Sequence, residues 1–342
     1  MTNPIIIAID AMGGEASPKK IIDGIEIALN KKKEYFFQLY GNTASIEELL
    51  NKKKHLKKYC EVFNSENSIA DDESPLMAAK KGNSTSMWAS IESQLNNKAQ
   101  ITLSAGNTGA LLVISRLVLK MLNGVDKPAL AGLWPNKKNV NVVLDLGANI
   151  ECNEKHLTDF CNMGAALYKS LFPEDIAKVG LLNVGSEENK GNEILKKTYS
   201  ILKENSSNDY IFSGYIEGNE IMNGEMNVIV TDGFTGNIAL KTAEGTSKFL
   251  TTKLKDVFSN SIIAKLGMLL AYSPLKKFKE KLDPRKYNGA IFLGLNGPVV
   301  KSHGATDALG FSYSIEMCEK IIRGDLINKI NKNLNSIDLK RT

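Results

Sequence analysis

The chain has 342 residues, 43% of them hydrophobic and 24% charged, which is the balance of an ordinary globular protein. A net charge of +5 is too small for a dedicated nucleic-acid-binding protein, and the few aromatic residues are not interleaved with the lysines, so we expect no nucleic acid partner. The four cysteines lack a CxxC spacing and the three histidines lack a metal-ligand spacing, which predicts reduced thiols and no metal. No run of about 18 apolar residues occurs and no signal peptide is recognisable, so we expect a cytoplasmic protein.

Six short apolar runs, each followed by a turn rich in Gly, Asn or Asp, recur along the chain. They cover residues 5–9, 101–103, 140–144, 179–182, 228–230 and 290–293. Continuous runs of this length indicate strands that are buried on both faces, and helical patterns often follow the turns. Strands that alternate with helices predict an α/β fold with a mostly parallel sheet, which we assign to one domain over residues 1–335. Ligands of such sheets bind at the carboxyl ends of the strands, where these turns fall.

Residues 246–286 break this pattern and are predicted to form an amphipathic, basic helical insertion. Apolar residues recur there at helical spacing, and Gly267 and Pro274 indicate a bent helical hairpin. Between residues 253 and 286, nine basic residues accompany three acidic ones, a local charge of +6 against +5 for the whole chain. Such a segment suits an anionic membrane or an acidic protein partner, and it also suits a core or dimer helix with solvated lysines. The candidate docking residues are Leu266, Leu269, Leu270, Lys276 and Lys277.

Several common catalytic motifs are absent. The sequence has no Walker A loop, no GxGxxG after the first apolar run and no GxSxG, so nucleotide-phosphate transfer and triad hydrolysis both lack their usual signals. We expect no cofactor. Cys152 has no histidine that the sequence places to activate it, and we interpret this residue as a small buried hydrophobe.

Six sequence blocks carry a resemblance to a known family. They are DAMGGEASP (10–18), SAGNTGALL (104–112), LDLGANIEC (144–152), GLLNVGSEENKGN (180–192), VTDGFTGNIALKTAEG (230–245) and GLNGPVVKSHG (294–304). In order and spacing they resemble the acyl-carrier-protein:phosphate acyltransferases of bacterial phospholipid synthesis, the PlsX family. The resemblance implies a three-layer αβα sandwich like that of phosphate acetyltransferases and isopropylmalate dehydrogenases, with a protruding helical hairpin. It also implies a homodimer.

The resemblance further implies a reaction. A fatty acyl group would move from an acyl carrier protein thioester to inorganic phosphate, and a membrane glycerol-phosphate acyltransferase would consume the acyl phosphate. Peripheral attachment to the inner face of the cell membrane is implied too. Phosphate is itself the nucleophile in this reaction and a thiol leaves readily, so the protein has to hold the anion near the thioester and stabilise the oxyanion.

Residues at the Gly-rich turns are the candidates for binding substrate. We expect Asn107, Thr108 and Gly109 to bind phosphate, with a plain helix cap as the alternative for Asn107 or Thr108. Further substrate-binding candidates, expected to line the same cleft or to shape the first turn, are Asn149, Gly233, Asp10, Gly13 and Gly14.

Four polar residues are the candidates for catalysis. Lys190 is expected to be the cation beside phosphate, and His303 to donate a hydrogen bond to the oxyanion or the leaving thiolate. Asp232 and Asn237 are expected to line the cleft, with a role as turn or cap residues as the alternative.

Two other functions stay open at this point. One is a short-chain phosphate acetyltransferase that uses acetyl-coenzyme A, and the other is a non-catalytic, membrane-associated scaffold. The helical insertion argues against the first, because a short soluble thioester needs no docking surface. The six turn motifs argue against the second.

Overall fold

A computed structural model of the chain describes residues 3–205, 209–259, 267, 269–281 and 283–341. The strands are β1 (Ile5–Asp10), β2 (Tyr35–Gly41), β3 (Cys60–Asn64), β4 (Ile101–Ser104), β5 (Ala129–Pro135), β6 (Val140–Leu144), β7 (Ala177–Asn183), β8 (Tyr210–Glu217), β9 (Val228–Val230), β10 (Ala290–Leu293) and β11 (Val299–Lys301). They form one 11-stranded sheet in the order β3-β2-β1-β4-β11-β10-β5-β6-β9-β7-β8. All six strands predicted from the apolar runs are present.

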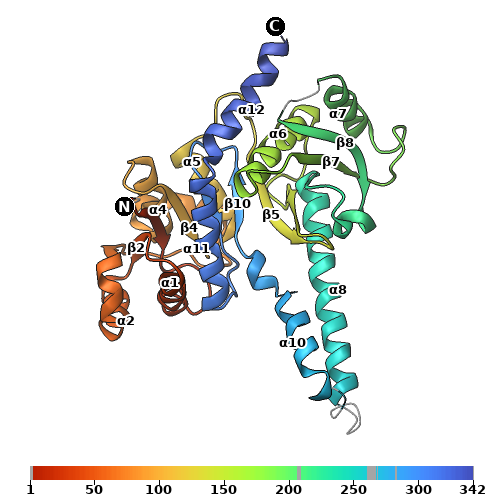
Figure 1. The fold of residues 1–342 in the computed structure, drawn as a ribbon. Coiled ribbons are helices and arrows are strands. Elements are labelled where there is room, and N and C mark those ends of the chain that lie inside the picture. Colours follow the sequence, from red (N-terminus) through yellow and green to blue (C-terminus); the bar gives the residue numbers. More distant parts are fainter. Residues whose placement is uncertain (1–2, 206–208, 260–266, 268, 282, 342) are drawn as a thin grey trace.

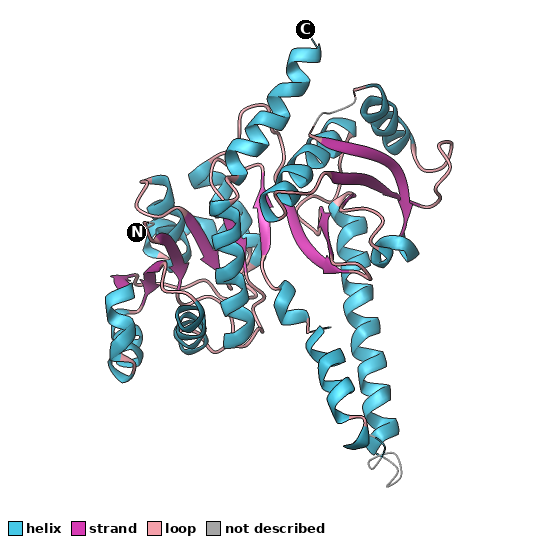
Figure 2. Cartoon of the chain, viewed as in Figure 1, coloured by secondary structure: helices cyan, strands magenta, loops and turns pink. Residues whose placement is uncertain are grey.

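Helices lie on both faces of this sheet (Figures 1 and 2). They are α1 (Lys19–Lys31), α2 (Thr43–Lys52), α3 (Pro75–Lys80), α4 (Ser86–Leu95), α5 (Thr108–Leu119), α6 (Glu154–Leu171), α7 (Glu193–Glu204), α8 (Gly233–Ser259), α10 (Tyr272–Lys281), α11 (Ala308–Arg323) and α12 (Leu326–Arg341). Among the described helices, none combines the length and the apolar composition that crossing a bilayer requires.

Alternate residues of the strands belong to two hydrophobic cores, one on each face of the sheet. Val142 and Leu144 pack into the core that contains residues of α1, α6, α11 and α12, whereas Val143 packs into the core that contains residues of α4 and α5. Because both faces are covered, four of the five residues of β6 are apolar, and the fifth, Asn141, is buried as well. The predicted three-layer αβα sandwich is therefore confirmed.

The sheet is mostly parallel, as predicted, but its two halves run in opposite directions. Strands β3, β2, β1, β4 and β11 are parallel to one another, and so are β6, β9, β7 and β8. Between these halves, β10 and β5 form antiparallel pairs on both sides. The turns after β1, β4 and β11 consequently fall at one end of the strands, and the turns after β6, β7 and β9 follow strands of opposite direction.

The segment predicted to be a basic insertion contains α8 and α10, which extend away from the rest of the molecule (Figure 1). α8 begins inside the fold at Gly233, so the range 246–286 starts part-way along this helix. Ala239, Leu240 and Ala243 pack against the core. Beyond them the apolar side chains of α8 are exposed, namely Phe249, Leu250, Leu254 and Val257. The domain limits of 1–335 and 246–286 stay predictions.

Among the candidate docking residues, Leu269, Leu270 and Lys276 are exposed, with Leu270 at 88%. Leu266 and the side chain of Lys277 lie outside the described part of the chain. The apolar residues of this segment thus lack the burial that a core helix would show.

Candidate active site

The first cluster of polar residues lies where β1 and β4 end. Asp10, the last residue of β1, is buried and accepts hydrogen bonds from Ser86 Oγ (2.6 Å), Ser104 Oγ (2.7 Å) and the Met12 amide (3.3 Å). Burial raises the pKa of this carboxyl, and the hydroxyl donors oppose that change. Asp10 therefore fixes the first turn against α4 and β4.

Glycines let the turn after β1 touch the turn after β4. A Cβ atom on Gly13 would lie 2.6 Å from the amide nitrogen of Gly106. Gly14 has a φ of 80°, and a Cβ there would lie 2.7 Å from the carbonyl oxygen of Ala105. The two backbones approach so closely that neither position has room for a side chain. Sequence analysis placed both glycines at the site, and their binding role stays a prediction.

The side chain of Asn107 is engaged by the protein itself. Its Oδ1 accepts a hydrogen bond from the Ala110 amide (3.0 Å) and caps α5, while Nδ2 donates to the carbonyl oxygens of Asp71 (2.9 Å) and Glu73 (2.8 Å). The capping alternative thus describes this side chain. Phosphate binding at this turn would fall to backbone N–H groups at the start of α5, where Thr108 is exposed.

Two buried lysines that sequence analysis missed lie beside these turns. Lys301, the last residue of β11, donates from Nζ to the carbonyl oxygens of Ala105 (3.4 Å) and Ser302. Lys20, in the first turn of α1, donates from Nζ to the carbonyl oxygen of Gly304. Burial lowers the pKa of both ammonium groups, that of Lys301 to about 8. The available signal was a lysine that directly follows the apolar residues Val299 and Val300.

His303 follows Lys301 and is exposed on the same cluster. Its Nδ1 accepts a hydrogen bond from the Ala305 amide (3.2 Å), which leaves Nε2 to carry the proton. Partial burial and the charge of Lys301 lower the pKa of this imidazole, so the ring is neutral at physiological pH. The charges of Lys241 and Glu244 on α8 also affect the pKa of His303. α8 therefore passes close to this first cluster.

The second cluster is built around Asp145, which directly follows β6 and is fully buried. Its carboxylate accepts hydrogen bonds from the amides of Leu130, Gly147, Ala148 and Asn149 and from Asn149 Nδ2, at 2.8 to 3.1 Å. Burial raises the pKa of this carboxyl despite these donors. Sequence analysis noted the turn but did not select Asp145, because the residue type alone does not distinguish an internal anchor.

The side chains of the predicted residues in the second cluster differ in how many hydrogen bonds they form within the protein. Asn149 Nδ2 is held by the Pro128 carbonyl (2.6 Å) as well as by Asp145, and the Asn149 carbonyl accepts from the Gly233 amide (2.8 Å). Asp232 accepts from the amide and the hydroxyl of Thr235 (2.9 and 2.8 Å), so this carboxylate caps α8.

Asn237 and Lys190 are the predicted residues whose side chains are most available. Asn237 is exposed on α8 beside Gly147, and among the described residues no hydrogen bond engages its amide. Lys190 is exposed in the loop after β7, and its ammonium forms no ion pair within the described part of the chain. Because β7 pairs in parallel with β9, the loop that holds Lys190 and the turn that holds Asp232 follow neighbouring strands at the same end of the sheet. Both catalytic roles stay predictions.

The site contains no activated thiol. Burial raises the pKa of Cys152 to about 12, and the Asp145 carboxylate acts in the same direction. Within the described ranges, no group of three or more His, Cys, Asp or Glu side chains is arranged to hold a metal ion. The side chains and backbone groups of the two clusters can therefore bind an anion and donate hydrogen bonds, but they offer no thiolate nucleophile.

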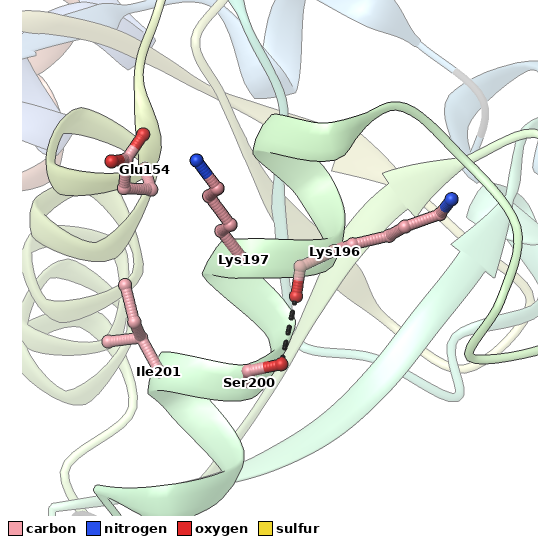
Figure 3. A pocket seen from close by; sticks show the side chains of 5 residues that line it. All are labelled: Glu154, Lys196, Lys197, Ser200 and Ile201. Carbon is pink, nitrogen blue, oxygen red and sulfur yellow. Dashed lines mark hydrogen bonds between the residues drawn. The ribbon is translucent and has the colours of Figure 1, made fainter.

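A hollow of about 350 Å³ lies elsewhere, between the start of α6 and α7 (Figure 3). It is open to solvent, and Ser200, one of its lining residues, donates its hydroxyl to the Lys196 carbonyl (3.2 Å). None of the predicted site residues lines this hollow.

Solved phosphotransacetylases share this fold. The EutD phosphotransacetylase from Staphylococcus aureus superposes with a TM-score of 0.60 at 14% identity over 94% of each chain. A phosphotransacetylase from Streptococcus pyogenes gives 0.62 at 14% identity over 95% of this chain and 94% of that one. At this identity the likeness shows the fold alone, and the class of protein is an αβα sandwich of the phosphotransacetylase type.

Sequence comparison assigns the family. The model of the family described as "Fatty acid synthesis protein" matches residues 5–329. A phosphate acyltransferase from Pelagibacter ubique is 55% identical over 98% of this chain and 100% of its own length, and one from Caulobacter vibrioides is 43% identical over 98% and 92%. The chain belongs to this phosphate acyltransferase family and is an acyltransferase. The resemblance carried by the six sequence blocks is therefore confirmed.

Proposed function

We propose that this acyltransferase moves a fatty acyl group from an acyl carrier protein thioester to inorganic phosphate. The observation that carries the proposal is the match, along nearly the whole chain, to relatives named phosphate acyltransferase, one of them 55% identical. The raised pKa of the Cys152 thiol agrees with a reaction in which phosphate, and not a protein thiolate, attacks the thioester.

The reaction needs one bond to form and one to break. A phosphate oxygen attacks the thioester carbonyl carbon, the carbonyl oxygen becomes an oxyanion, and collapse expels the carrier thiolate and leaves an acyl phosphate. A neutral, exposed His303 whose Nε2 carries the proton is suited to donate to the oxyanion or the departing sulfur. The Asn237 amide offers further N–H donors, and the Lys190 ammonium offers positive charge for phosphate.

The exposed apolar and basic surface of α8 and α10 supports the proposal that the protein docks with a partner. Large apolar side chains beyond the fold are unusual on a protein surface unless something covers them. We assign to this surface the docking of the acyl carrier protein and the inner face of the cell membrane, and expect the chain to work as a homodimer. The acyl phosphate would then feed phospholipid synthesis through a membrane glycerol-phosphate acyltransferase.

A thiol-release assay tests the reaction. Purified protein is incubated with a long-chain acyl carrier protein, with and without inorganic phosphate, and acyl phosphate is trapped with hydroxylamine. We expect thiol release that requires phosphate. Release from acetyl-coenzyme A alone would instead establish the short-chain acetyltransferase, and no release from either thioester would favour the scaffold.

A further inference from the structure

Lys20 and Lys301 are two buried cations that come from distant parts of the chain. Lys20 is 5% exposed and Lys301 is 9% exposed, and the charge of Lys20 contributes to the lowered pKa of Lys301. Their ammonium groups reach the junction of three turns, since they donate to backbone carbonyls of Ala105, Ser302 and Gly304. The sheet and α1 hold both side chains in place.

Neither ammonium is neutralised by direct contact with a carboxylate. Among the described residues no carboxylate oxygen lies within 4.0 Å of either nitrogen. Carboxylates further away raise the pKa of the lysines by attraction. Asp71 does so for both lysines, Asp10 for Lys301, and Glu15 for Lys20. Burial outweighs these attractions, because the pKa of each lysine is lowered and not raised. Buried charge without a close partner is unfavourable, and a bound anion would compensate it.

Donor groups for such an anion remain at this junction. An ammonium has three N–H donors, of which Lys301 uses two on carbonyls and Lys20 uses one. A Cβ on Gly14 would lie 2.8 Å from Lys20 Nζ, so glycine at this position lets the ammonium group approach the turn after β1. His303 is exposed, and the charges of Lys301 and Lys20 contribute to its lowered pKa, so this imidazole adjoins the pair. By this count three ammonium N–H donors have no acceptor among the described residues.

We infer that Lys20 and Lys301 together bind a phosphate-type oxyanion at the junction of the turns after β1, β4 and β11. This rests on the proposed function, in which two substrates carry such a group. One is inorganic phosphate, and the other is the phosphodiester of the pantetheine arm on the acyl carrier protein. Two positive charges and several N–H donors match a phosphate oxyanion better than they match the uncharged thioester.

The test compares Lys20→Met and Lys301→Met with Lys19→Met in the full-length protein. Lys19 is the adjacent, exposed lysine of α1, so its replacement removes the same charge away from the junction. The Kd of inorganic phosphate is measured by calorimetry, and the KM values for phosphate and for acyl carrier protein are measured by thiol release. Circular dichroism checks the fold of each variant.

We expect the Kd and the KM of phosphate to rise at least tenfold in both junction variants and to stay unchanged in Lys19→Met, because hydrogen bonds to charged groups are strong. A rise in the KM for the acyl carrier alone would also support the oxyanion site and assign it to the pantetheine phosphodiester. In that case an acyl pantetheine without the phosphodiester should not distinguish the variants from wild type.

Folded variants with unchanged Kd and KM values for both substrates would overturn the inference. If Lys301→Met does not fold, Lys20→Met decides alone, since Lys20 lies on a helix outside the sheet. Wild-type protein that binds phosphate in the calorimeter but releases no thiol would refute the proposed reaction and leave the anion site standing.

Discussion

Replacing Lys301 with Met should change how the stability of the fold depends on pH. Burial lowers the pKa of Lys301 from 10.5 to about 8, so the folded protein holds this proton less tightly than the unfolded chain does. Below about pH 8 Lys301 is ionised in both states, and its burial then lowers the free energy of unfolding by the full effect. Between about pH 8 and 10.5 the unfolded chain binds more protons, and the free energy of unfolding therefore rises with pH. One pKa unit corresponds to 1.36 kcal/mol, so the full effect is about 3 kcal/mol.

About 2 kcal/mol of this effect falls between pH 7 and pH 9.5, a range accessible to urea unfolding. The measurement is the free energy of unfolding of wild type and Lys301→Met at several pH values in phosphate-free buffer, followed by circular dichroism. Tyr35 and Tyr210, whose pKa values burial raises, are common to both proteins and cancel in the difference. We expect wild type to gain about 2 kcal/mol relative to the variant across this range. A difference that stays constant with pH would refute the reasoning.

Four further results are expected. Lys190→Ala should lower the turnover number without a change in melting temperature, because this lysine is exposed in a loop, and wild-type turnover would remove it from the mechanism. Cys152→Ser should keep turnover within about twofold in the thiol-release assay, since a thiol with a pKa of about 12 is not the nucleophile. In Gly236→Ala the new Cβ would lie 1.9 Å from the Asp145 carbonyl oxygen, so thermal unfolding should show a melting temperature several degrees lower or no folded protein. Charge reversal at Lys276 combined with Leu270→Glu should weaken sedimentation with anionic vesicles or binding to acyl carrier protein, and retention of both would contradict the docking role.

The strands that could be predicted are those in which most residues are apolar on both faces. β6, β9 and β10 have the predicted bounds, and all but one of their residues are buried. β2 was not among the six predicted strands, and Gln38 divides its apolar residues into two short runs. In the fold this residue is buried and accepts a hydrogen bond from Ser93 Oγ (2.6 Å), which depends on a helix far away in sequence.

The opposite direction of the two halves could not be predicted from local patterns. It depends on β10 and β11 pairing with β5 and β4, whose residues lie more than a hundred positions earlier. An apolar run shows that a strand is buried, but it carries no information about which strand lies beside it or in which direction.

Within the site, the residue types predicted where the turns lie but not what each side chain does. Asn107 and Asp232 cap helices, whereas Asn237 is exposed, and all three are polar residues beside glycine in the sequence. Lys20 and Lys301 were missed because a buried lysine looks like any other lysine until the fold covers it. For Lys20 only the packing of α1 shows that the side chain is internal, whereas the two valines before Lys301 were the one available signal.

The place of β10 and β11 in the sheet delays folding until late in the synthesis of the chain. Residues 290–301 form the two central strands that join the first half of the sheet to the second. While a ribosome is still translating the middle of the chain, β4 and β5 each lack a neighbour and expose unpaired backbone groups. The fold can close only when nearly nine-tenths of the chain has been synthesised, which makes it a slow-folding topology with a long interval in which open strands are available to other chains.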